Sequence, residues 1–260
     1  MHKPIADLSR ARILISNDDG VDAPGIKVLE DVARSLSDDV WVVAPESEQS
    51  AVAHSLTIRR PLRLRRVAER RYTVDGTPTD SVLLGVRQLL QDQRPDLVLS
   101  GINRGSNLGD DVTYSGTVAA AMEGTLLGIP SIALSQHIAG DGPIKWETAR
   151  HWAPDIIRRA VAAGWPVNVL LNVNFPDLPA DRVTGVAVAG QGKRKIGDEL
   201  VERIDPRGQP YYWIGGQRLE DPGIEGSDLE AVHRGKVSVT PLGVDFTHQA
   251  TLAKMASLFQ

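Results

Sequence analysis

The sequence contains no cysteine, few aromatic residues and no long uninterrupted apolar run. The absence of cysteine excludes disulfides, thiolate metal sites and a cysteine nucleophile. The 29 basic and 33 acidic residues nearly cancel, so the chain lacks the positive excess that coats nucleic acid or a membrane surface. No apolar stretch approaches the roughly 20 residues of a membrane span, and the N-terminus has no apolar signal segment. We therefore expect a cytoplasmic protein that binds neither a nucleic-acid duplex nor a membrane.

What is present fits one large α/β core, because the 260 residues are 42% hydrophobic. Short β-rich runs alternate with helical segments, which predicts a mostly parallel, doubly wound sheet. The predicted strands are 12–17, 40–44, 56–58, 62–67, 72–74, 96–99, 131–134, 169–173, 183–189 and 236–240. The predicted helices are 24–35, 77–90, 117–127, 146–163 and 249–258.

The pattern changes after about Arg182. Residues 199–204 and 211–214 flank the turn Asp205-Pro206-Arg207-Gly208, which predicts a β-hairpin. Its arms are rich in aliphatic and aromatic residues, and a lone hairpin cannot bury them. We expect the hairpin to pack on another subunit or to extend across the main sheet. The preceding basic run, Lys193-Arg194-Lys195, is expected to form a solvated face.

The stretch Ser16-Asn17-Asp18-Asp19-Gly20 directly follows an apolar run that reads as a buried strand. Adjacent carboxylates repel each other, and burying them unpaired is costly. A divalent cation would relieve that cost, and Asp and Asn oxygens suit Mg²⁺ or Mn²⁺. The stretch therefore predicts a metal site at the carboxyl end of a strand, where open α/β sheets bind ligands. The alternative is a solvated turn, since these residue types also favour turns.

Two further polar loops follow predicted strands. In residues 44–55, Ser50 can offer a neutral oxygen to a cation, whereas a lone histidine such as His54 is more often structural. In residues 100–111, Asn103 can ligate a metal through its amide oxygen, and Asn107 can donate to a phosphate. The alternatives are an ordinary surface loop and a flexible connector.

A fourth polar loop opens a predicted helix. Ser115, Gly116 and Thr117 stand where backbone N–H groups and the positive helix end would favour a phosphate. The alternative is N-capping by Ser115 or Thr113, and both roles can hold at once. Asp80, near the start of another predicted helix, is expected only to stabilise the helix dipole.

These motifs, in this order, resemble the SurE family (survival protein E) of metal-dependent nucleotidases. The resemblance runs from about Arg12 to the segment 237–241, nearly the whole chain. Besides the Asn-Asp-Asp-Gly stretch and the segment 43–50, it is carried by Asp75-Gly76-Thr77-Pro78-Thr79-Asp80, Ser100-Gly101-Ile102-Asn103-Arg104-Gly105-Ser106-Asn107 and Tyr114-Ser115-Gly116-Thr117-Val118.

The resemblance implies a Rossmann-like fold in a single domain spanning 1–260. Its core would cover about 11–185, and a hairpin with a terminal helix, used in oligomerisation, about 186–260. It implies hydrolysis of nucleoside 5′-monophosphates, with some members also cleaving 3′-nucleotides and short polyphosphate, and assembly as a homodimer or homotetramer. One divalent ion per subunit, Mg²⁺ or Mn²⁺, would be held by Asp18, Asp19, Ser50 and Asn103. The implied phosphate-binding positions are Asn107, Ser115, Gly116 and Thr117.

For the chemistry, we expect Asp18 or Asp19 to be catalytic. The sequence leaves open which one accepts the proton of the attacking water, and whether a carboxylate attacks directly. The alternatives are a non-catalytic nucleotide-binding module, an NAD-dependent Rossmann oxidoreductase, and a structural oligomer whose metal only fixes loops. Asn-Asp-Asp-Gly in place of G-x-G-x-x-G after the first strand disfavours dinucleotide binding.

Overall fold

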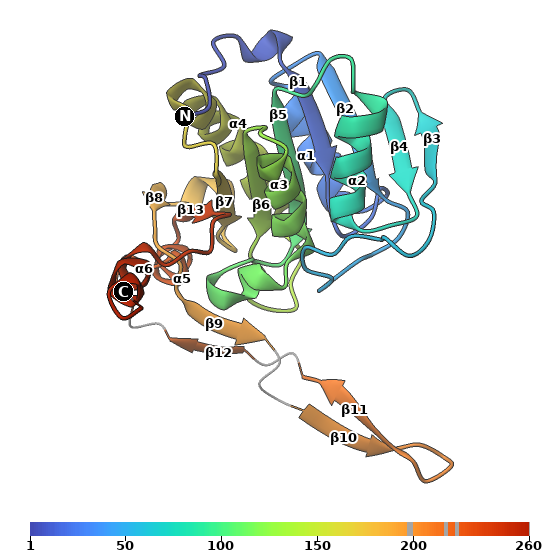
Figure 1. The fold of residues 1–260 in the computed structure, drawn as a ribbon, viewed down its shortest axis with the longest axis vertical. Coiled ribbons are helices and arrows are strands. Elements are labelled where there is room, and N and C mark those ends of the chain that lie inside the picture. The colour runs from blue at the N-terminus through green and yellow to red at the C-terminus, as the bar shows by residue number, and fades with distance from the viewer. Residues whose placement is uncertain (197–199, 216–217, 222–223, 260) are drawn as a thin grey trace.

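A computed structural model describes residues 1–260 except 197–199, 216–217, 222–223 and 260. Within these residues, the chain forms a nine-stranded sheet of order β3-β4-β2-β1-β5-β6-β7-β13-β8 (Figure 1). Strands β4, β2, β1, β5, β6 and β7 are parallel to one another, and β3 and β13 run antiparallel to their neighbours β4 and β7. The strands are β1 Arg12–Ser16, β2 Asp39–Pro45, β3 Leu64–Ala68, β4 Arg71–Val74, β5 Leu97–Arg104, β6 Ser131–Gln136, β7 Val169–Phe175, β8 Val186–Val188 and β13 Val237–Gly243.

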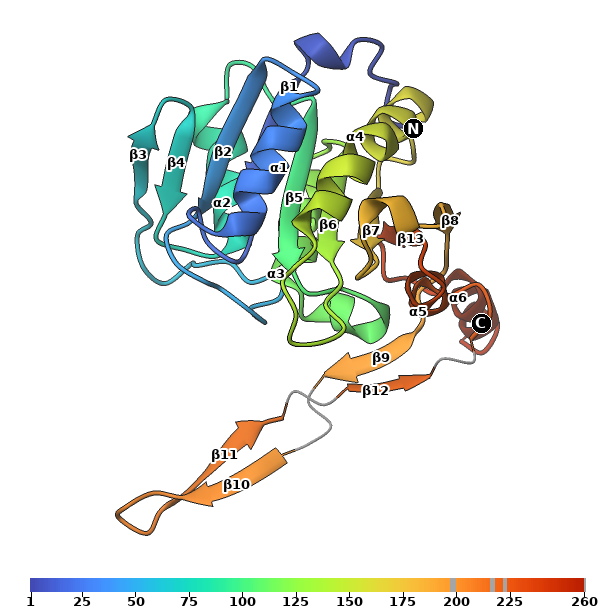
Figure 2. The same cartoon turned by 180° about the vertical axis from the view of Figure 1, so that it is seen from behind.

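Helices cover both faces of this sheet, as Figures 1 and 2 show from opposite sides. On one face lie α1 (Pro24–Arg34) and α4 (Trp146–Ala163), and on the other lie α2 (Pro78–Leu84) and α3 (Gly116–Leu126). Strand β1 serves both layers because successive side chains point to opposite faces. Ile13 and Ile15 belong to the cluster that includes α1 and α4, whereas Leu14 belongs to the cluster that includes α2. The predicted doubly wound α/β fold is confirmed.

The strand order determines which loops lie next to each other at the edge of the sheet. From β1 the chain builds outward through β2 to β4, and then returns to place β5 on the opposite side of β1. The loops after β1 and β5 therefore leave the sheet next to each other, at the point where the strand order reverses. Open α/β sheets bind ligands in this crevice.

The C-terminal third adds elements outside the large sheet. Strands β9 (Lys193–Ile196) and β12 (Arg218–Asp221) form one antiparallel ribbon. Strands β10 (Leu200–Ile204) and β11 (Pro210–Ile214) form a second, and the helices are α5 (Asp228–His233) and α6 (Gln249–Ala256). The predicted hairpin is confirmed as β10–β11, apart from residue 199, which lies outside the described residues.

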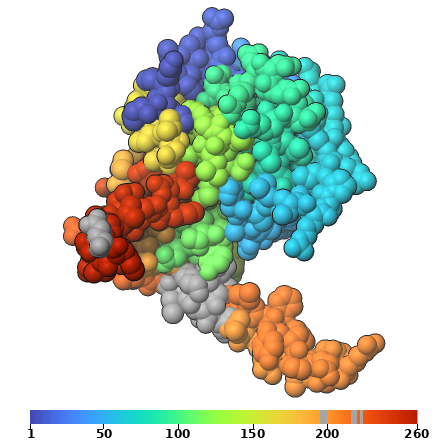
Figure 3. All heavy atoms as spheres, in the orientation of Figure 1, coloured from blue at the N-terminus to red at the C-terminus, as the bar shows by residue number. Residues whose placement is uncertain are grey.

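The hairpin does not extend across the main sheet, so that expectation is wrong. It projects away from the sheet in Figure 1, and its orange atoms stand outside the main body in Figure 3. Every residue of β11 is exposed. Packing on another subunit stays a prediction.

Several predicted boundaries need correction. Residues 56–58 form no strand, because the Thr57 N–H donates to the Asp80 carboxylate at 3.0 Å instead of to a neighbouring strand. Strand β5 continues past residue 99 to Arg104, since β6 is long enough to pair with it beyond an irregularity. Predicted helix 77–90 is α2 followed by a π-helical turn, and predicted strand 183–189 is reduced to β8. The sequence did not indicate β9, β12 or α5.

None of the helices in the described ranges combines the length and apolarity needed to cross a bilayer.

Candidate active site

The loop after β1 is folded so that Asp18 is buried. The Asn17 side-chain amide donates to the Gly20 carbonyl at 2.8 Å, and the Gln49 N–H donates to the Asp18 carbonyl at 2.7 Å. Asp18 is only 6% exposed, so the solvated turn considered as an alternative is excluded. The Thr117 hydroxyl donates to its carboxylate.

The N-terminus of α3 reaches Asp18 because residue 116 has no side chain. A Cβ atom on Gly116 would lie 2.6 Å from Asp18 Cβ and 2.9 Å from a carboxylate oxygen. The positive end of α3 therefore abuts a buried carboxylate, a favourable electrostatic arrangement. The side chain of Ser115 caps the helix by accepting from the Val118 N–H at 3.0 Å. Thr113 instead donates to the Asp110 carbonyl, so Ser115 is the cap.

Asp18 and Asp19 both hold their protons more tightly than free carboxyl groups do. Burial raises the pKa of Asp18 to about 6; the hydrogen bond from Thr117 opposes this rise, and the charge of Asp19 adds to it. Burial also raises the pKa of Asp19. The Arg104 N–H, 3.2 Å from Asp19 Oδ2, opposes that rise, whereas the nearby Glu48 carboxylate adds to it. The site thus brings together carboxylates whose negative charge the described residues neutralise only in part.

These groups line one cavity of about 210 Å³. The cavity brings together six of the predicted site residues: Asp18, Asp19, Ser50, Asn103, Asn107 and Ser115. The other two predicted residues, Gly116 and Thr117, do not line the cavity but contact Asp18. Sequence reasoning assigned no role to four other lining residues: Glu48, Arg104, Ser106 and Asp111. All four stand in the same polar loops, and that position was the signal that could have found them.

The oxygen atoms of the cavity suit a hard divalent cation. Ser50 Oγ lies 2.8 Å from the Glu48 carboxylate, to which it donates, and the Asn103 amide nitrogen donates to the Gly105 carbonyl at 2.8 Å. Among the described residues, no group of three or more His, Cys, Asp or Glu side chains is arranged to hold a metal. A cation here would therefore need neutral oxygens, such as those of Ser50 and Asn103, beside the two carboxylates.

Asn107 is fixed by a buried amide network. Its N–H donates to Asn174 Oδ1 at 2.8 Å, and its carbonyl accepts from the side-chain amides of Asn172 and Asn174 at 2.8 and 3.1 Å. One N–H of its own side-chain amide donates to Ser135 Oγ at 2.8 Å, which leaves the other N–H for a ligand. Residues from β6 and β7 thus hold a donor at the rim of the acidic cavity.

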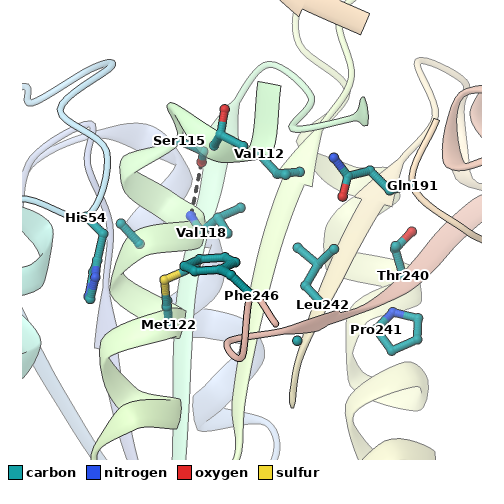
Figure 4. Close-up of a pocket in the computed structure, with 13 residues that line it drawn as sticks. His54, Val112, Ser115, Val118, Met122, Gln191, Thr240, Pro241, Leu242 and Phe246 are labelled. Carbon is teal, nitrogen blue, oxygen red and sulfur yellow. Dashed lines mark hydrogen bonds between the residues drawn. The ribbon is translucent and has the colours of Figure 1, made fainter. Parts of the chain in front are cut away.

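A second, larger pocket of about 470 Å³ adjoins the site through Ser115 (Figure 4). Its apolar lining comes mainly from α3, from the end of β13 and from Phe246, which follows that strand. His54 lies at its edge, with Nε2 3.0 Å from the Glu123 carboxylate. The pocket can receive an apolar or aromatic group beside the acidic cavity.

A family model described as "Survival protein SurE" matches residues 13–198.

The chain belongs to the SurE family.

A Paramagnetospirillum magneticum protein named 5′-nucleotidase SurE is 67% identical over 256 residues, covering 98% of each chain. A Rhodospirillum rubrum protein of the same name is 56% identical over 262 residues, covering 100% of each. The crystal structure of the SurE protein from Aquifex aeolicus superposes with a TM-score of 0.84 at 45% identity, covering 96% of this chain and 100% of that one. The SurE match includes every predicted site residue, from Asp18 to Thr117.

Proposed function

We propose that this SurE-family protein is a metal-dependent phosphomonoesterase that hydrolyses nucleoside 5′-monophosphates to nucleoside and phosphate. The observation that carries the proposal is the shared cavity, which places Asp18 and Asp19 beside the donors of Asn107 and Ser115. The relatives described above are named 5′-nucleotidases, which supports this choice of substrate.

In this proposal one Mg²⁺ or Mn²⁺ ion binds Asp18, Asp19, Ser50 and Asn103. The raised pKa of Asp18 supports cation binding, because a bound cation would remove the cost of the buried charge. When bound, the ion would neutralise charge on the phosphoryl oxygens and make a nearby water more acidic.

The phosphate is held by Asn107 and by the start of α3. The Ser115 hydroxyl already accepts a hydrogen bond, so its own proton can be donated to a phosphate oxygen. The backbone N–H groups of Gly116 and Thr117 belong to the first turn, which has no intrahelical acceptor for them; that of Thr117 also hydrogen-bonds the Asp18 carboxylate. These donors would fix the phosphoryl group for in-line attack by water, and one of the two adjacent carboxylates would accept the proton of that water.

We extend the proposal to 3′-nucleotides and short polyphosphate as further substrates, to a cytoplasmic location, and to a homodimer or homotetramer. Family resemblance supports the substrates, and the exposed apolar hairpin supports self-association. We also propose that residues 1–260 act as one unit, with 186–260 serving oligomerisation.

An NAD-dependent or purely nucleotide-binding module is the alternative. Acidic Asp18 and Asp19, rather than a glycine-rich turn, follow β1 at the switch point. Without a cation, they would repel the pyrophosphate of a dinucleotide. A calorimetric titration with NAD and with AMP, each with and without Mn²⁺, distinguishes this alternative from the proposed phosphomonoesterase.

The decisive experiment is phosphate release from a panel of nucleotides, first in EDTA and then with Mg²⁺ or Mn²⁺ restored. We expect activity only with the metal, and Asp19→Asn to lower it by about 100-fold, the scale of losing one transition-state contact. Asp22→Asn, at an exposed carboxylate nearby, is the matched control and should retain wild-type turnover. Full activity in EDTA, or in Asp19→Asn, would contradict the proposal.

A further inference from the structure

Arg194 departs most from the sequence-based expectation, because the predicted solvated basic run contains a buried guanidinium. Its side chain is only 2% exposed, whereas that of neighbouring Lys193 is 67% exposed. Burying a charged side chain is costly unless it is paired and hydrogen-bonded. The partners of Arg194 therefore indicate its role.

Those partners belong mainly to the loop that supplies Asn107. Arg194 Nε lies 3.0 Å from Asp111 Oδ2, and Nη2 donates to the Ser106 carbonyl at 3.0 Å and to the Ser106 hydroxyl at 3.1 Å. Nη1 lies 3.3 Å from a Glu220 carboxylate oxygen in β12. The planar fork of an arginine can satisfy several acceptors in fixed directions, which a lysine cannot do.

The backbone of β9 also packs directly on this loop, which it passes below in Figures 1 and 2. Gly109 has φ +56°, and a Cβ there would lie 2.7 Å from Arg194 N, so a side chain would separate the two segments. Asp228, fully buried, accepts from the Gly109 N–H at 3.0 Å and from the Gly192 N–H at 2.8 Å. These contacts therefore hold the loop directly against β9.

We propose that Arg194 is a positioning residue for phosphate recognition, acting through Asn107. This inference rests on the proposed function. Ser106 and Asp111 line the acidic cavity on either side of Asn107 in sequence, whereas Arg194 does not line it. The amides of Asn172 and Asn174 hold Asn107 from β7, and Arg194 holds the preceding peptide from β9. Both supports are needed to direct the Asn107 side chain at the substrate.

The test compares Arg194→Gln with Lys193→Gln, which removes one positive charge from the exposed side of the same strand. With AMP and Mn²⁺, we expect kcat/KM of Arg194→Gln to fall about 100-fold, the cost of a displacement near 1 Å, with part of the loss in KM. Lys193→Gln should match the wild type. Arg194→Lys should fall between them, because it keeps the charge but loses the fork.

A double-mutant cycle with Asn107→Ala tests the route. If Arg194 acts through Asn107, adding Arg194→Gln to Asn107→Ala should lower kcat/KM by no more than about twofold, which is the scatter expected for additive effects. If the losses in kcat/KM caused by the two substitutions instead multiply in the double variant, the inference is overturned. So would unchanged KM in Arg194→Gln and Arg194→Lys with only a lower melting temperature, since that is the result of a purely structural role.

Different measurements test the role of Arg194 and the nucleotidase activity. If the wild type releases no phosphate from any nucleotide, the proposed function fails. Calorimetry with inorganic phosphate and Mn²⁺ then still tests Arg194, and we expect weaker phosphate binding by Arg194→Lys than by Lys193→Gln. Equal affinities would overturn the inference, whatever the substrate of the enzyme.

Discussion

At the scale of single residues, Asp18 combines burial, charge and proximity to another acid. Its carboxylate is tied to Thr117 and pressed against Gly116, so it cannot turn out into solvent without disturbing α3. Without a cation, the folded protein bears the cost of this charge, and a raised pKa is the physical sign of that cost.

Asp18→Asn should therefore stabilise the metal-free protein. Because the folded-state pKa of Asp18, about 6, lies above the ordinary 3.8, the folded state binds the proton more tightly. The destabilisation of the wild type by ionised Asp18 is therefore absent at low pH, and it grows as the pH rises from about 4 to about 6. In EDTA, the free energy of unfolding of Asp18→Asn should exceed that of the wild type by about 3 kcal/mol at pH 7, and the two should converge near pH 4.

Urea unfolding in EDTA at several pH values measures this difference. Adding Mn²⁺ should raise the stability of the wild type but not that of Asp18→Asn, and Asp22→Asn serves as the control with an exposed carboxylate. A wild type that gains nothing from Mn²⁺, or an Asp18→Asn protein that unfolds more easily in EDTA, would contradict the assignment.

At the scale of elements, the first turn of α3 is the part of the fold that the site depends on most. Ser115 caps it, Thr117 orients Asp18, and Gly116 permits the contact between helix and loop. The same turn would supply phosphate donors, so its position relative to β1 sets both halves of the proposed site.

Gly116→Ala should impair the site through a single methyl group. The added Cβ would stand 2.6 Å from Asp18 Cβ, so α3 or the loop after β1 must shift. We expect kcat/KM for AMP to fall about 100-fold. Gly142→Ala is the matched control, because a Cβ there meets nothing within 4 Å, and it should keep wild-type kinetics. Wild-type kinetics in Gly116→Ala would show that the close contact is not needed.

At the scale of the whole molecule, the β10–β11 hairpin exposes large apolar side chains on one face, beside Glu202. Four side chains that cross-strand pairing places on one face are each more than half exposed: Leu200, Ile204, Tyr212 and Ile214. A two-stranded hairpin gains little stability by itself, and apolar surface of this kind marks an interaction site. A second copy of this chain is the partner that we predict.

The double substitution Leu200→Ser and Ile214→Ser tests this, because these residues form one cross-strand pair. Analytical ultracentrifugation should show a dimer or tetramer for the wild type and a smaller species for the variant, since apolar burial drives most association. Arg207→Ser, at the exposed turn, is the control and should assemble normally. A wild type that sediments as a monomer at micromolar concentration would refute this role of the hairpin.

Much of the fold and site followed from local patterns in the sequence. The alternation of β-rich and helical runs predicted the doubly wound sheet, and helix α4 was predicted with the bounds that the structure has. The predicted site residues gathered at one edge because the carboxyl ends of parallel strands meet there. They could be chosen as candidates from the sequence because adjacent acids, amides and hydroxyls at strand ends are chemically distinctive without any knowledge of their neighbours.

What only the tertiary structure decided depends on segments far apart in the chain. Residues 193–195 look like a solvated run, yet Arg194 is buried because Ser106, Asp111 and Glu220 converge on it. Residues 56–58 look like a strand, yet the Asp80 carboxylate takes up the Thr57 N–H. Local composition sets what a segment can form, but the burial of a charge and the pairing of a backbone group are set by whichever distant partner the fold brings within hydrogen-bonding distance.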